Sequence, residues 1–166
     1  MKQPLANIAS SQNENIDQTN IVQLLKDEGG WYRPIQTLNL LARADRTIEV
    51  VSLLRSESLD GELALENGQY YGQCLNDSPD GVGIMYCISN KQHLFLYEGL
   101  WKDGNLVSGR RIMVKVHIWE VYEGEFANQI PHGFGFHRRS NKVQYVGHFK
   151  NSKYDGEGRW ENGQGK

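Results

Sequence analysis

The side chains of this chain that could support metal binding or nucleophilic catalysis are its histidines and cysteines. They are His93, His117, His132, His137, His148, Cys74 and Cys87. A zinc site needs such ligands at short, paired spacings, and a catalytic histidine needs a nucleophile and an orienting carboxylate beside it. Neither arrangement occurs in the sequence, and no glycine-rich loop leads into a helix that could bind phosphate. The sequence therefore predicts no catalytic residue, no cofactor and no metal site, and it favours structural roles for the histidines.

Glycines and aromatic residues instead form a repeat. Four segments start with a tyrosine and have a glycine two positions later, and three of them add an aromatic residue two positions beyond that glycine. The segments start at Tyr70, Tyr97, Tyr122 and Tyr145, at intervals of 27, 25 and 23 residues. A further glycine follows each tyrosine after 11 or 12 residues, at Gly81, Gly109, Gly133 and Gly156. Self-similarity at a short period indicates a repeat array, and such arrays bind or space other molecules more often than they perform chemistry.

Each repeat unit is typical of two strands joined by a loop. In the third unit we expect strands at residues 122–126 and 134–137, with a loop at residues 128–132. Alternation along the first strand puts its tyrosine, glycine and phenylalanine on one face. A ring from a neighbouring strand can lie over the bare glycine backbone, so this face is expected to be the core. Consecutive hairpins of this kind predict an all-β fold, an elongated single antiparallel meander.

The chain divides into three parts. Residues 1–20 are polar and are expected to form a disordered tail. Residues 21–60 are expected to form an N-terminal region with a short helix and, at the β-branched residues 47–51, a strand. Residues 61–166 form the array of about four repeats, the last of them incomplete. Near its start, Asn67-Gly68 between alternating runs predicts a hairpin turn.

Composition and charge limit the classes of partner. Residues 1–67 have a net charge of −4 and residues 68–166 have +2, a balance that does not favour nucleic acid. No apolar run approaches the ~18 residues of a membrane-spanning helix, and the polar N-terminus lacks the apolar segment of a secretory signal. We therefore expect a cytoplasmic protein with reduced cysteines rather than a disulfide, at most peripheral to a membrane or the cytoskeleton.

The repeated residues resemble the MORN (membrane occupation and recognition nexus) repeat, with the pattern Tyr-Glu-Gly-x-Trp/Phe followed by Gly-x-Gly. Residues 122–135 match this pattern closely, and residues 97–104 match its first half. The sequence departs from the pattern at Cys74, where an aromatic residue is expected, and after Gly109, where the second glycine is missing. The resemblance covers about residues 61–163.

The resemblance implies elongated antiparallel sheets without catalytic residues. Such repeats act as scaffolds at membranes and the cytoskeleton, and they are appended to phosphatidylinositol-phosphate kinases and some methyltransferases. We therefore expect a non-enzymatic scaffold or protein-interaction module with a protein partner that the sequence does not identify. The alternative is a non-catalytic targeting part of a lipid kinase or methyltransferase system, or a fragment of a larger such protein.

Two sets of residues are candidates for contacts. The aromatic set could form the core, a peptide-binding groove or both, and it consists of Tyr97, Trp101, Tyr122, Phe126, Tyr145 and Phe149. The basic set could bind anionic lipid headgroups weakly, and it consists of Arg138, Arg139 and Lys142. Solvated turns interleaved with acidic residues are the competing interpretation of the basic set. No strand follows Trp160, so self-association through the C-terminal sheet edge is a further expectation.

Overall fold

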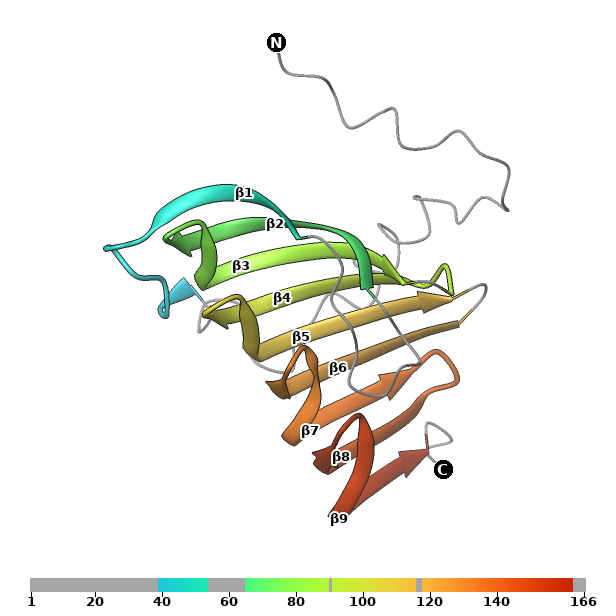
Figure 1. Ribbon diagram of the computed structural model, residues 1–166. Helices are drawn as coiled ribbons and strands as arrows, with labels where there is room; N and C mark the ends of the chain where they lie inside the picture. Colours follow the sequence, from blue (N-terminus) through green and yellow to red (C-terminus); the bar gives the residue numbers. More distant parts are fainter. Residues whose placement is uncertain (1–38, 54–64, 90, 116–117, 163–166) are drawn as a thin grey trace.

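The structure, a computed structural model, describes residues 39–53, 65–89, 91–115 and 118–162 of the 166-residue chain. Residues 1–38, with the predicted tail and short helix, lie outside the described residues. The described part contains one sheet of nine strands that follow one another in chain order, and every neighbouring pair is antiparallel (Figure 1). The predicted all-β meander is therefore confirmed.

The strands are similar in length and leave β1 and β9 as the outer strands of the sheet. They are β1 Thr47–Leu53, β2 Leu65–Leu75, β3 Ser78–Ser89, β4 Leu94–Lys102, β5 Asn105–Lys115, β6 Ile118–Ala127, β7 Ile130–Arg139, β8 Val143–Lys150 and β9 Lys153–Asn162. The first of them includes the strand expected at residues 47–51 and pairs with β2 along its whole length. The sheet thus begins before the first repeated segment.

A row of paired glycines crosses the sheet from β2 to β9. Each glycine lies directly opposite the next, in the order Gly72, Gly83, Gly99, Gly109, Gly124, Gly135, Gly147 and Gly158. In three hairpins a tyrosine ring covers the pair on its own two strands. A Cβ atom built on Gly135 would lie 2.4 Å from ring atoms of Tyr122, and Tyr70 and Tyr145 block Gly83 and Gly158 in the same way. In these three hairpins the rings leave no space for a side chain, and at Gly99 and Gly109 the facing backbone occupies that space.

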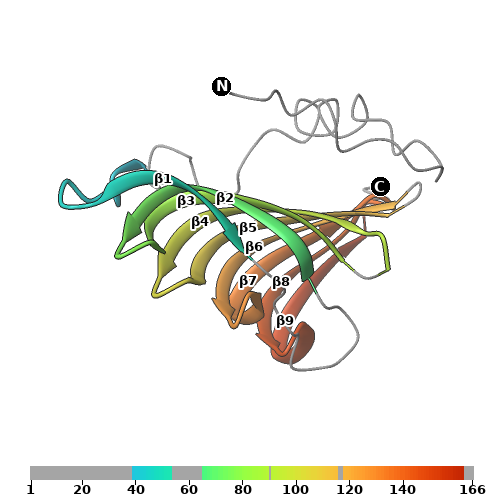
Figure 2. The same ribbon diagram turned by 45° about the horizontal axis from the view of Figure 1, so that its top comes forward.

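The same tyrosines tie down the ends of the hairpins. The Tyr122 hydroxyl donates to the carbonyl oxygens of Glu125 at 2.9 Å and His132 at 3.1 Å. Tyr70 and Tyr145 also donate to the carbonyl three residues ahead, at 2.9 and 3.3 Å. Just beyond the glycine row the strand pairing shifts register within each of these hairpins. Each hairpin end therefore curls out of the plane of the sheet, as Figure 2 shows.

Four hairpins close with two-residue turns in which both residues have positive φ. The turns are Asn76-Asp77, Asp103-Gly104, Asn128-Gln129 and Asn151-Ser152, with φ between 48° and 79°. Positive φ at both positions is what a type I′ turn requires, and its twist matches that of paired strands. The loop predicted at residues 128–132 is therefore wrong, because a two-residue turn suffices and β7 already begins at Ile130.

The hairpin turn predicted at Asn67-Gly68 is also wrong. Both residues lie inside β2, where Gly68 pairs with Leu53 and the register against β3 shifts between Glu66 and Gln69. Gly68 pairs with β1, and the residues on either side of the dipeptide pair with β3, so the two residues are accommodated as an irregularity within β2 instead of forming a turn.

The aromatic face carries the hydrophobic core in a single layer. Its rings pack edge to face, for example Tyr70 against Trp101 at 5.2 Å and Tyr122 against Phe149 at 4.8 Å between ring centroids. Such ring pairs add about 0.5–1.5 kcal/mol beyond the area that they bury. Because the hairpin ends curl over the rings, Tyr70 is fully buried and Tyr122 is only 1% exposed. Among the described residues, the core is formed by side chains of the sheet strands alone.

We predict that Gly135→Ala lowers the free energy of unfolding by about 1–3 kcal/mol, because the added methyl group overlaps the Tyr122 ring. Chemical denaturation measures the change. Glu157→Ala, at an exposed position of β9, is the control and should change stability little. Repeating Gly135→Ala in a Tyr122→Leu background should reduce its cost, since the blocking atoms are then gone. An unchanged cost in that background would contradict the packing of ring on glycine.

Candidate interaction surfaces

The structure places the whole aromatic set inside the core. Its members are between 1% and 7% exposed, namely Tyr97, Trp101, Tyr122, Phe126, Tyr145 and Phe149. Burial also raises the pKa of Tyr97 and Tyr122, so both hydroxyls stay protonated. The indole N–H of Trp101 donates to the Gly83 carbonyl at 3.2 Å. A partner could reach these rings only by opening the curled hairpins.

The basic set does not converge on one surface. The guanidinium of Arg138 lies 5.9 Å from the ring centroids of both Trp119 and Phe136, on the face opposite the aromatic core. Arg139 points to the aromatic face, where its Nε is 3.4 Å from Glu120 Oε1. Only Lys142, in the turn before β8, is exposed.

A cluster of polar side chains joins β6, β7 and β9 on the aromatic face. The Nδ1 atom of His137 is 2.7 Å from the Tyr154 hydroxyl, and its Nε2 atom is 3.6 Å from Glu120 Oε2. The contact with His137 lowers the pKa of Glu120, whereas burial raises the pKa of Tyr154. The order acid, histidine, hydroxyl resembles a nucleophile site, but a hydroxyl with a raised pKa is a poor nucleophile. We assign the cluster a structural role, linking three strands.

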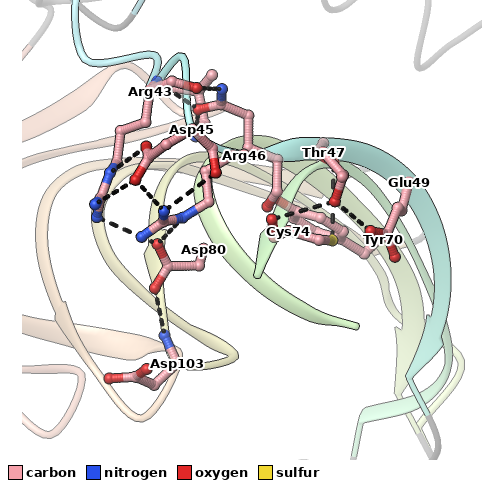
Figure 3. A network of polar contacts seen from close by, with 12 residues as sticks. Arg43, Asp45, Arg46, Thr47, Glu49, Tyr70, Cys74, Asp80 and Asp103 are labelled. Carbon is pink, nitrogen blue, oxygen red and sulfur yellow. Dashed lines mark hydrogen bonds and ion pairs between the residues drawn. The ribbon is translucent and has the colours of Figure 1, made fainter. Parts of the chain in front are cut away.

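A second polar network fixes the segment that precedes β1 (Figure 3). Arg46 Nε donates to Asp80 Oδ1 at 2.8 Å, and both side chains are less than 10% exposed. The other carboxylate oxygen of Asp80 accepts from the backbone N–H of Asp103 at 3.5 Å. Arg43 also approaches Asp80, at 3.5 Å, and pairs with Asp45 at 3.3 Å. One buried carboxylate thus connects the approach to β1 with two neighbouring hairpins.

The side chain of Gln73 reinforces this network. Its amide nitrogen donates to the Arg43 carbonyl at 2.6 Å, and its amide oxygen accepts from the N–H groups of Arg43 at 3.0 Å and Val82 at 3.1 Å. A Cβ atom on Gly81, where φ is +120°, would lie 2.4 Å from that oxygen. The repeated glycine at this position therefore makes room for Gln73. Nothing in the sequence pattern singled out Arg43, Gln73 or Asp80, because Arg43 lies 30 positions from Gln73 and 37 from Asp80.

The face opposite the aromatic core has an exposed apolar patch over β1, β2 and β3. Val50, Tyr71 and Ile84 lie side by side across these strands and are 69%, 55% and 43% exposed. Ile48 and Tyr86 flank this row on the same face and are 65% and 42% exposed. Contiguous exposed apolar side chains of this kind are typical of interaction sites. We refer to these five residues as the apolar patch.

The residues with reactive side chains show no catalytic arrangement in the described ranges. Cys74 and Cys87 are free and buried, and burial raises the pKa of Cys87 to about 12, which keeps the thiol protonated. The ring of His148 packs on Phe134 at 5.6 Å, and His117 lies outside the described residues. No group of three or more His, Cys, Asp or Glu side chains in these ranges could hold a metal ion. The same ranges contain no helix long and apolar enough to cross a membrane.

Comparison with protein-family models and with curated proteins finds no relative of this chain. No protein-family model matches the chain, and no curated protein matches it in sequence. The surfaces described above are therefore the basis for any statement about function.

The buried carboxylate of Asp80 predicts a specific dependence of stability on pH. The hydrogen bond from Arg46 holds the pKa of Asp80 below its ordinary value of 3.8. Since the pKa is lower in the folded state than in the unfolded state, the contribution is fully present above about pH 5 and is lost as the pH falls through the folded-state pKa. We expect Asp80→Asn to lower the melting temperature at pH 7 and to have little effect near the folded-state pKa.

Thermal unfolding of both proteins across this pH range measures the difference. Asp155→Asn, at an exposed position of β9, is the matched control and should follow the wild-type curve. A difference between Asp80→Asn and wild type that stays constant down to acidic pH would show that the ion pair with Arg46 contributes nothing.

Proposed function

We propose that the protein is a non-enzymatic scaffold, an interaction module built of MORN-like hairpin repeats. The observation that carries this proposal is the difference in exposure between the apolar side chains on the two faces of the sheet. The aromatic set lies in the buried core on one face, whereas the apolar patch on the other face stays in contact with solvent. Exposed apolar surface weakens a protein's solubility, and its presence is best explained by a partner that covers it.

The chemistry of the apolar patch favours another protein as that partner. Tyr71 and Tyr86 supply large rings with polar tips, the kind of side chain that is enriched at protein interfaces. A polar pair borders the patch, where the Gln69 side chain donates to the Ser52 hydroxyl at 3.0 Å. An apolar centre with a hydrogen-bonding rim is the usual anatomy of such an interface.

We predict that Tyr71→Glu combined with Ile84→Glu removes partner binding and leaves the fold intact. Both side chains are exposed, so the added charges cost little in the free protein but would be buried without a partner in a complex. Quantitative capture from cell extract, with each variant as bait, measures the effect. Ile118→Glu, at a 48% exposed apolar residue away from the patch, is the control. The same proteins captured equally by both variants and by wild type would contradict the proposal.

Binding to anionic lipid is expected to be weak, because the basic set is divided between two faces. Arg138 lies over aromatic rings and Arg139 lies beside Glu120, which leaves Lys142 as the exposed cation of the set. Exposed charges are screened over about 8 Å at physiological ionic strength, so any binding should fade with salt.

Sedimentation with phosphoinositide-containing vesicles at low and high salt tests this expectation. Lys142→Glu should abolish the residual binding, and Lys102→Glu, an exposed lysine in another hairpin, should not. Tight binding that is indifferent to salt would show that a different surface engages the membrane.

A further inference from the structure

The two outer strands of the sheet differ in how they are protected against pairing. The outer strand β9 alternates charged residues with glycines and aromatics, and its pairing with β8 has a register shift. Charges and irregular pairing are the usual means by which proteins protect a sheet edge. The other outer strand, β1, has the sequence TIEVVSL and pairs with β2 at seven consecutive positions without a shift. It contains no lysine, no proline and no bulge, and its only charge is Glu49.

Among the described residues, β1 has a neighbouring strand on one side only. None of the residues that the structure describes pairs with its other side, and Figure 1 shows β1 at the margin of the sheet. Ile48 and Val50 are about two-thirds exposed. Both residues belong to the apolar patch and lie on its outermost strand, β1. A strand added beside β1 would therefore extend the row formed by Ile84, Tyr71 and Val50.

The sequence of β1 is complementary to itself. We propose that two copies of the chain join β1 to β1 in antiparallel register, about a two-fold axis at Val50. Because Val50 is the central residue of Thr47–Leu53, this register pairs all seven positions of the strand. It sets Val50 against Val50, Ile48 against Ser52 and Glu49 against Val51 of the second copy. A two-fold axis at Glu49 would instead place two carboxylates opposite each other, which is unfavourable.

This arrangement explains the apolar patch where it reaches the edge. The exposed row of Ile84, Tyr71 and Val50 would continue without interruption into the same row of the second copy. The added backbone hydrogen bonds would satisfy donors and acceptors that otherwise face water, as in other cases of strand addition. Seven residue pairs along one edge bury less than the ~1,200 Å² of a standard interface, so we expect a reversible dimer. The pairing goes beyond the proposed scaffold function and does not depend on it.

Disulfide trapping tests the register. Directly opposed Cβ atoms lie about 4.5–5.5 Å apart, close enough for a disulfide after a small adjustment, so Val50→Cys should cross-link rapidly. In the same register the two copies of Ile48 are four positions apart, about 13 Å, so Ile48→Cys alone should not cross-link. A mixture of Ile48→Cys with Ser52→Cys should form the mixed dimer. The native Cys74 and Cys87 are 1% exposed and do not compete.

Sedimentation equilibrium of the full chain tests the affinity. Val50→Lys places two like charges on the axis and should raise the dimer dissociation constant at least ~10-fold, and Ile118→Lys, at a remote exposed residue, should not change it. A monomer at high micromolar concentration, or equal cross-linking of Val50→Cys and Ile48→Cys, would overturn the proposal. Dimers that survive Val50→Lys but are lost in Trp160→Pro would also overturn it, and would support instead the self-association through β9 expected from the sequence. Cross-linking results remain interpretable even if Val50→Lys alters the fold.

Discussion

The contact between a tyrosine ring and the bare backbone of two paired glycines is the interaction on which this sheet depends. Tyr122 over Gly124 and Gly135 is the clearest example, since any side chain at Gly135 would overlap the ring. The ring covers the glycine backbone, and the Tyr122 hydroxyl donates a hydrogen bond to the carbonyl oxygen of Glu125, which lies beyond the bend. Curling follows from this bond, and the curled end then covers the rings beside it. In the part of the chain that the structure describes, a single sheet thus has a buried aromatic core on one face.

Because the aromatic set is buried, the exposed apolar side chains of the described sheet lie mainly on the opposite face and at its margins. The strand β1 belongs to both regions, since it carries part of the apolar patch and is an outer strand of the described sheet. The ion pair of Arg46 with Asp80 and the hydrogen bonds of Gln73 hold the segment before β1 against two hairpins. A well-positioned edge loses less conformational entropy when it pairs with another strand. The polar network would therefore also favour the proposed pairing of β1.

Two kinds of misprediction come from the same physical cause. The sequence predicts a five-residue loop at residues 128–132. In the structure two residues with positive φ complete the turn, and Ile130 already pairs with β6 as the first residue of β7. Asn67-Gly68 has the composition of a turn, but Gly68 pairs with Leu53 of β1 and the residues before and after the dipeptide pair with β3, so it lies inside β2. Local propensity is worth about 1 kcal/mol per residue, so pairing with a neighbouring strand outweighs it. The cluster of His137 with Glu120 and Tyr154 was missed because strand register alone brings these residues together.

The all-β class, the antiparallel meander and the identity of the core face could be read from residue order, because strand alternation and repeat spacing are local properties of the chain. The same regularity marked the tyrosines and glycines, since three of the hairpins have the same close contact between ring and backbone. Which aromatic side chains are inaccessible, which arginines share a face and how the segment before β1 is held depend on the register between strands. Register is set by the pairing of residues distant in the sequence, and only the folded sheet brings Arg46 to Asp80 or exposes Val50 beside Tyr71.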